Sequence, residues 1–141
     1  SIYGDVLSRC VDLMQTLNSA HFKSAFDFAN FVQCGEDTVK CWDALRPYIV
    51  YIHIKDAVST DKENVLCGTG EGKIPELLHK AIVEEGYTGF LTLEPHLVLF
   101  DSLQSLETTD AKNIIRENKY KNGAEGYAAQ YHALCDILAK F

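Results

Sequence analysis

Residues 48–57 read YIVYIHIKDA, an apolar and aromatic run that leads into His53 and is followed by two charged residues. The run is continuous rather than alternating, which is typical of a strand buried on both faces of a parallel α/β sheet. Two other stretches are built in the same way, KSAFD at 23–27 and FLTLE at 90–94. Together they predict three parallel strands, each ending in a side chain that can bind a metal ion.

Helical patterns surround these strands. Residues 5–18 carry apolar residues at three- and four-residue steps, with Asp5 as the predicted N-cap; these are Leu7, Cys10, Val11, Met14 and Leu17. Asp37 is predicted to cap a second helix, which ends before Pro47 because proline disfavours helical geometry in the residue before it. The alternation of helices and apolar strands predicts an α/β fold with parallel strands.

The second half of the chain continues the alternation. Residues 56–72 are predicted to form a long loop, and Pro75 to begin a helix that stops at Gly86. A short helix is predicted over 110–118, DAKNIIREN. The last helix is predicted to turn one face to the core, carrying Tyr127, Tyr131, Leu134, Leu138 and Phe141.

Composition and charge limit the function. A chain of 141 residues is expected to form one domain, residues 1–141. Its net charge of -7 argues against a nucleic-acid partner, and no apolar run approaches the length of a membrane-spanning helix. The five cysteines include no C-x-x-C pair, which favours a reducing cytoplasm over a disulfide framework. We therefore expect a cytoplasmic protein that acts on a small molecule.

The last residues of the three apolar stretches, Asp27, His53 and Glu94, are candidate metal ligands. In parallel α/β sheets, sites assemble at the carboxyl ends of the strands, and neighbouring strands lie only about 4.8 Å apart. Two carboxylates and one imidazole suit Mn²⁺, Mg²⁺, Co²⁺ or Zn²⁺, and the residues do not choose among them. The alternatives are structural: a hydrogen-bonded histidine, an aspartate that caps the next loop, and a glutamate paired with a lysine.

Four further polar residues follow the strand ends and are candidate substrate-binding residues: Asn30, Lys55, Asp56 and His96. Asn30 and His96 could contact a hydroxyl-rich ligand or form hydrogen bonds with backbone groups of the loops. The lysine and aspartate could form an ion pair at the rim, and the aspartate could instead hold the imidazole or a bound water.

The glycine-rich segment GTGEG at 68–72 is a weak candidate for nucleotide binding. Its spacing is not G-x-G-x-x-G, and it does not directly follow a strand. A glycine-rich loop that closes over the strand ends explains it as well. Because loops after the last barrel strands often bind phosphate, a sugar phosphate remains open as a ligand.

Four motifs in this order carry a resemblance: FDFANFVQCGED (26–37), YIHIKDA (51–57), GTGEGKIPELL (68–78) and EEGYTGFLTLEPHL (84–97). The chain resembles the xylose-isomerase-like TIM-barrel superfamily, in particular its sugar phosphate isomerase/epimerase branch. The resemblance covers roughly the first hundred residues together with the last helix. It implies the C-terminal half of a (β/α)₈ barrel.

The resemblance also implies a chemistry. Asp27, His53 and Glu94 match the metal ligands at the ends of barrel strands six, seven and eight. A divalent metal would polarise a sugar carbonyl, and Glu94, ligand and catalytic base at once, would move a proton through an enediolate. The implied activity is isomerisation or epimerisation of a sugar or sugar phosphate.

The sequence departs from the family pattern in two places. The family's second glutamate precedes a segment resembling IYGD (2–5), where this chain has no residues to match it, and a complete barrel has about 250 residues. We therefore expect an incomplete, inactive barrel that pairs with the N-terminal half or forms a homo-oligomer. Related apurinic endonucleases carry Asp-x-x-His where this chain has Asp27 and Asn30, which disfavours DNA repair.

Two alternatives to the isomerase remain. A lyase of the same superfamily, such as a keto-inositol dehydratase, would share the metal ligands. A non-catalytic half-barrel could instead serve as a sugar-binding or assembly module.

Overall fold

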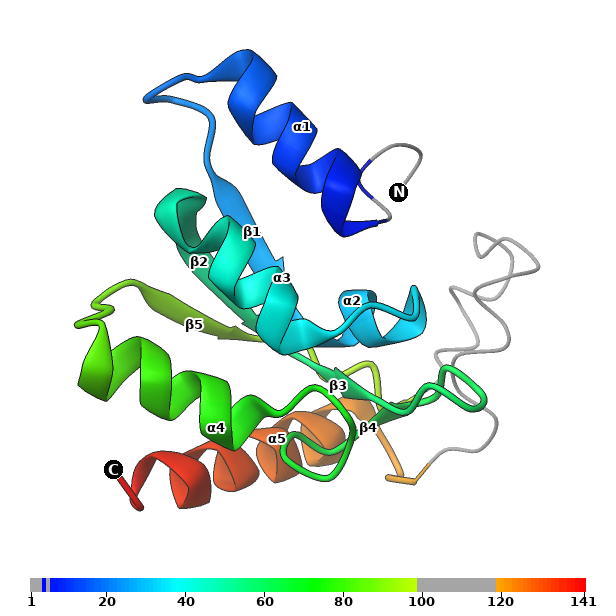
Figure 1. The fold of residues 1–141 in the computed structure, drawn as a ribbon. Coiled ribbons are helices and arrows are strands. Elements are labelled where there is room, and N and C mark those ends of the chain that lie inside the picture. The colour runs from blue at the N-terminus through cyan, green and yellow to red at the C-terminus, as the bar shows by residue number, and fades with distance from the viewer. Residues whose placement is uncertain (1–3, 5, 99–118) are drawn as a thin grey trace.

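Three parallel strands form the centre of the structure, a computed structural model that describes residues 4, 6–98 and 119–141. They are β1 (Ser24–Asp27), β2 (Ile49–Ile54) and β5 (Phe90–Leu93), arranged in the order β1-β2-β5 (Figure 1). Each strand is therefore added beside the previous one along the chain, as in a barrel wall. The predicted α/β fold with three parallel strands is confirmed.

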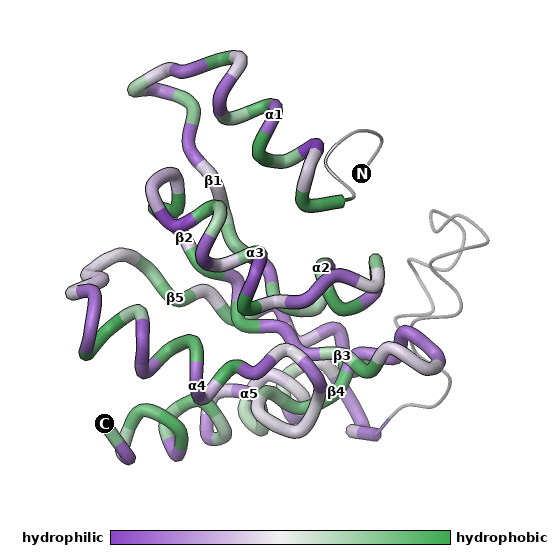
Figure 2. The backbone as a smooth tube through the Cα atoms, in the orientation of Figure 1, coloured by the Kyte–Doolittle hydropathy of each residue, from purple (hydrophilic) through white to green (hydrophobic). Residues whose placement is uncertain are grey.

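Helices connect and cover the strands. They are α1 (Leu7–Leu17), α2 (Phe28–Gln33), α3 (Thr38–Leu45), a 3₁₀ turn (Arg46–Tyr48), α4 (Ile74–His79), a π-helical turn (Lys80–Glu84) and α5 (Gly123–Leu138). Hydrophobic and hydrophilic residues alternate along α1 and α4 in Figure 2, as expected for helices with one face on a core. None of the helices in the described part of the chain is long and apolar enough to cross a membrane.

The starts of these helices test the predicted caps. Asp37 accepts the backbone N–H groups of Val39 and Lys40 at the start of α3, as predicted. At α1 the N-cap position is held by Val6, and the first amide is instead bound by the distant carboxylate of Glu36, 2.9 Å from the nitrogen of Leu7. The predicted cap, Asp5, and the predicted helix at 110–118 lie outside the described residues.

One face of the sheet is packed against the helices. Phe26, Ile52 and Ile54 are fully buried there, and the ring of Trp42 on α3 meets that of Phe26 edge-on at a centroid distance of 5.2 Å. This layer is the core of the molecule, because apolar side chains from the strands and helices leave water together.

The other face of the sheet is open in the described residues. Ala25 is exposed, Tyr51 is half-buried, and Phe90 is 75% exposed. A hydrogen bond from the hydroxyl of Thr92 to that of Tyr51 joins β5 to β2 across this face. The expectation of a strand buried on both faces is therefore wrong for β2, because the described helices cover only one of them.

Two further predictions are corrected. The expected loop at 56–72 contains a short antiparallel pair, β3 (Asp56–Ala57) with β4 (Asn64–Val65). The inward face of α5 is also partly rotated from the expected one. Leu134 is buried and Leu138 is partly buried, as predicted, but the other buried residues are Gly126, Gln130 and Ile137. Tyr127 and Tyr131, expected inside, are 49% and 55% exposed. The glycine explains the rotation, because a Cβ there would lie 3.2 Å from Val98, so the helix approaches most closely on the glycine side.

Candidate metal centre at the strand ends

The carboxyl ends of the three strands bring Asp27, His53 and Glu94 together. Asp27 pairs with His53 in the parallel register, and Glu94 follows the last residue of β5. His53 Nδ1 lies 2.9 Å from Glu94 Oε2 and 3.6 Å from Asp27 Oδ2. One ligand atom from each residue lies within 4.8 Å of the others, so one ion could contact all three.

The two carboxylate oxygens of Asp27 have different surroundings. Oδ1 accepts the backbone N–H of Asn30 at 3.0 Å and so caps α2. This agrees with the structural alternative in which Asp27 caps the segment that follows its strand. Oδ2 is buried and makes no hydrogen bond among the described residues, although the ammonium of Lys55 lies 3.0 Å away as an ion pair. A buried oxygen that lacks a hydrogen bond, next to an imidazole and a second carboxylate, fits a divalent cation. The residues present therefore suit a divalent metal ion.

Lys55 lies inside this cluster rather than at its rim. Its side chain is only 8% exposed, and its ammonium is 3.5 Å from Glu94 Oε2 in addition to its contact with Asp27. The alternative of a rim ion pair between Lys55 and Asp56 is wrong, because the lysine is paired with the other two carboxylates. The strand geometry explains this, since Lys55 lies two residues beyond His53 and so on the same face.

Glu94 joins the cluster to His96. Its Oε2 faces His53 and Lys55, while its Oε1 lies 3.0 Å from His96 Nε2. Burial alone would raise the pKa of Glu94, but the hydrogen bond with His96 and the positive charge of Lys55 hold the pKa below its ordinary value. Glu94 is therefore a carboxylate at neutral pH, the form that both a metal ligand and a base require.

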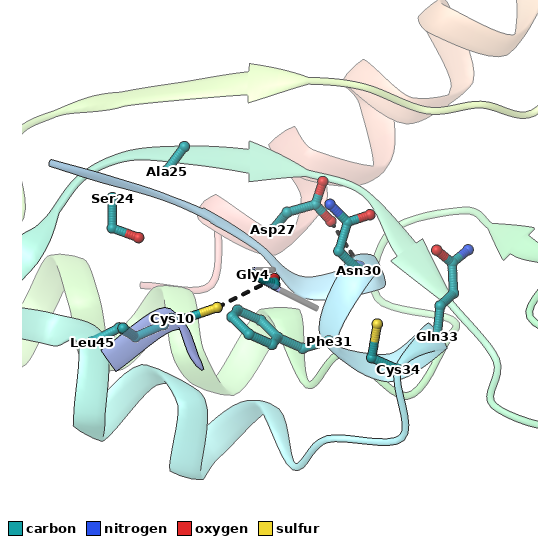
Figure 3. A pocket seen from close by; sticks show the side chains of 10 residues that line it. All are labelled: Gly4, Cys10, Ser24, Ala25, Asp27, Asn30, Phe31, Gln33, Cys34 and Leu45. Atoms are coloured by element: carbon teal, nitrogen blue, oxygen red, sulfur yellow. Dashed lines mark hydrogen bonds between the residues drawn. The ribbon is translucent and has the colours of Figure 1, made fainter. Parts of the chain in front are cut away.

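His96 and Asn30 lie beside the cluster, where a ligand could reach them. The side chain of His96 is 51% exposed, and its backbone adopts a left-handed φ of 45°. Asn30 is exposed and lines, with Asp27 and Gln33, a pocket of about 290 Å³ between β1, α2 and α1 (Figure 3). Figure 3 shows Asp27 and Asn30 next to each other at the end of β1.

Asp56 is placed differently from the prediction. It is fully buried, and its carboxylate accepts four backbone N–H groups, those of Ala57, Gly68, Gly70 and Gly72, at 2.9 to 3.0 Å. Burial raises its pKa above the ordinary value, while these four hydrogen bonds act in the opposite direction. The expectation that Asp56 contacts substrate or the imidazole is therefore corrected, because three of its described hydrogen bonds go to the glycine-rich segment 68–72 and the fourth goes to the next residue, Ala57.

This contact also explains the glycines of GTGEG. A Cβ on Gly70 would lie 2.5 Å from Asp56 Oδ1, and one on Gly72 would lie 2.7 Å from the same atom. Only glycine allows the backbone to approach the carboxylate this closely. The segment is wrapped around an aspartate of its own chain, which removes the main reason to consider it a nucleotide-binding loop.

Two residues of α5 support the site and were missed in the sequence. The buried Gln130 donates a hydrogen bond to the carbonyl of Ile54 at 3.0 Å and accepts one from the N–H of Cys67 at 3.1 Å. The hydroxyl of Tyr127 donates to the carbonyl of Leu93, the residue before Glu94. A polar residue on the apolar stripe of a helix is the signal that could have identified Gln130.

Comparison with known proteins supports this architecture. No protein-family profile and no curated protein sequence matches the chain. Among solved structures, it is similar to a xylose isomerase domain protein from Planctomyces limnophilus, with a TM-score of 0.66 and 19% identity. The alignment covers 95% of this chain and 44% of that protein, so the chain spans less than half the length of its structural neighbour. The likeness shows the fold: the chain has the architecture of part of a TIM barrel.

Proposed function

We propose that the protein is a divalent-metal-dependent isomerase or epimerase of a sugar or sugar phosphate. The observation that carries the proposal is the convergence of Asp27, His53 and Glu94 at the ends of three neighbouring parallel strands. Active sites of TIM-barrel enzymes lie at this end of the strands. The likeness to a xylose isomerase domain protein supports the same reaction class.

In this proposal Asp27, His53 and Glu94 hold the metal, which would polarise the carbonyl and neighbouring hydroxyl of the substrate. Glu94 accepts the proton from the carbon next to the carbonyl, and the electron pair of that C–H bond forms the enediolate. Protonation of the neighbouring carbon, with transfer of the hydroxyl proton to the former carbonyl oxygen, completes an isomerisation. An epimerisation instead requires a second acid, the role that the resemblance gives to the second glutamate, to protonate the same carbon from the opposite face. His96, bonded to the other oxygen of Glu94, orients the carboxylate for this transfer.

Deuterium exchange tests the proton transfer without knowledge of the substrate. The metal-loaded protein is incubated in deuterium oxide with a panel of aldoses, ketoses and their phosphates, and NMR detects deuterium at the carbon beside the carbonyl. We expect incorporation from at least one panel member even without net conversion, because net conversion in this family uses a second glutamate. The Asp27→Ala/His53→Ala variant should show none. Absence of incorporation with every panel member would contradict the proposal and favour a binding or assembly module.

We further propose that the open face of the sheet is an interface. Within the described residues, β1 and β5 each have a strand neighbour on one side only, and Phe90 projects from this face with 75% of its surface exposed. Unpaired strand edges and exposed aromatic side chains favour association with another chain. For the chain as it stands, the simplest partner is a second copy.

Sedimentation velocity tests this interface. We expect the chain to form dimers or larger species at micromolar concentration, and Phe90→Asp to shift it towards the monomer. Val83→Asp is the matched control, since Val83 is also an exposed apolar residue, at 54%, but belongs to the π-helical turn. A wild-type monomer at all concentrations, or equal effects of the two variants, would contradict the proposal.

The state of the cysteines supports a proposal of a reducing compartment such as the cytoplasm. None of the five cysteines forms a disulfide bond in the described part of the chain. Burial raises the pKa of both Cys41 and Cys67 to about 12, so these two thiols stay protonated and unreactive at neutral pH.

A further inference from the structure

We propose that Lys55 is a resident cation which a divalent metal must displace from Asp27 and Glu94, so that this lysine sets the metal affinity of the site. The inference rests on the proposed metal centre and adds a determinant to it. Its consequence is that removal of the lysine charge tightens metal binding.

The same oxygen atoms serve the lysine and the proposed metal. Asp27 Oδ2 and Glu94 Oε2 are the carboxylate oxygens that face His53 Nδ1, at 3.6 and 2.9 Å. They are also the two oxygens nearest the ammonium of Lys55, at 3.0 and 3.5 Å. The ammonium therefore occupies the space between the two carboxylates that a shared metal ion needs.

The chain leaves Lys55 little freedom. The carbonyl of Lys55 accepts the N–H of Ala29 at 3.2 Å, which fixes its backbone between β2 and the start of α2. Its side chain is 8% exposed, and the described residues provide it with no ion pair apart from Asp27 and Glu94. A buried ammonium without a carboxylate is strongly disfavoured, so displacement by a metal carries a cost in free energy.

The balance of charge points in the same direction. Two carboxylates and one ammonium leave a net charge of about -1 for a divalent ion, half of what the carboxylates alone would supply. A metal ion at the carboxylates would also lie within a few ångströms of the ammonium, and like charges at this distance in a partly buried site repel strongly. The lysine therefore opposes the metal both by occupying its ligands and by its charge.

The experiment measures Mn²⁺ binding to wild type, Lys55→Met and Lys55→Arg by isothermal titration calorimetry at one fixed pH. Methionine keeps the unbranched apolar length of the side chain without the charge, and arginine keeps the charge as the matched control. We expect Lys55→Met to bind Mn²⁺ at least tenfold more tightly than wild type, and Lys55→Arg to bind no more tightly than wild type. Thermal unfolding should show a larger rise in Tm on addition of Mn²⁺ for Lys55→Met than for wild type.

The outcomes separate this inference from the proposed function. If Lys55→Met binds Mn²⁺ as wild type does or more weakly, while Asp27→Ala/His53→Ala abolishes binding, the lysine inference is overturned and the metal centre stands. If wild type and Lys55→Met both fail to bind Mn²⁺, both are overturned. Should Lys55→Met fail to fold, Lys55→Gln provides the same loss of charge with a polar end group, and the same comparison applies.

Discussion

Alanine substitution of both Asp27 and His53 is expected to lower the affinity for Mn²⁺ by more than about 100-fold. The double variant removes two of the three converging ligand atoms, and even loss of a residue that only supports a ligand costs about 10–100-fold in metal affinity. It also leaves Glu94 as the one remaining carboxylate of the cluster, already paired with Lys55 and His96. Elemental analysis after dialysis and calorimetric titration measure the effect.

A matched control for this variant is Asp43→Ala/His79→Ala. Asp43 and His79 are the same residue types on exposed positions of α3 and α4, where they pair with Lys80 and Glu84. The control should bind Mn²⁺ as wild type does and should fold with similar stability, since exposed ion pairs contribute little. Equal metal occupancy in wild type and in the Asp27→Ala/His53→Ala variant would end the claim of a metal centre.

The second large effect is expected for Asp56→Ala, which should reduce the free energy of unfolding by about 3 to 5 kcal/mol. The substitution removes the acceptor of four backbone N–H groups, and Ala57 and Gly72 are buried, so their amides cannot turn to water instead. A loss of this size is a large share of the stability of a small domain, which is about 5–15 kcal/mol. Urea or thermal unfolding followed by circular dichroism measures it.

Asp37→Ala is the matched control for Asp56→Ala. Asp37 also accepts backbone N–H groups, those of Val39 and Lys40, but at the exposed start of α3. The loss of an exposed N-cap costs about 1 kcal/mol, because water can replace the missing acceptor. If the two variants lose the same stability, the carboxylate of Asp56 does not have the role in holding the glycine-rich segment that its contacts indicate.

The sequence was sufficient for the three parallel strands, β1, β2 and β5, and for the order of the candidate ligands. Short apolar runs that end in a polar side chain are a local property, and parallel pairing places their ends at one edge of the sheet. The proximity of Asp27, His53 and Glu94 follows from these two facts, and the structure places one atom from each within 4.8 Å of the others. Local rules also predicted the cap at Asp37 and the helix start at Pro75, which lies in the first turn of α4.

The partners of the buried polar residues depended on contacts between distant parts of the chain. Lys55 and Asp56 are neighbours just beyond the end of β2. The side chain of Asp56 binds a segment 12 to 16 residues further along, whereas that of Lys55 joins the candidate metal cluster. Because side chains alternate along an extended chain, Lys55 and Asp56 point to opposite faces. The polar groups that each side chain contacts there depend on how the other elements pack. The sequence pattern around the two residues therefore did not separate their roles.

For α5 too, the sequence predicted the helix, but the tertiary structure decided which of its residues are buried. Apolar spacing identified a helix, but the aromatic residues on its expected face are exposed, and the buried stripe contains Gly126 and Gln130. The glycine permits close approach, and the glutamine satisfies the carbonyl of Ile54, a partner 76 residues away in the chain. The sequence by itself determined the three parallel strands, the helices on either side of them in the chain and where the candidate ligands fall on the strands, because their apolar patterns are local, but it did not predict α2 or the pair β3–β4. Only the tertiary structure decided which polar side chain meets which backbone group, because those hydrogen bonds form between segments that packing alone brings together.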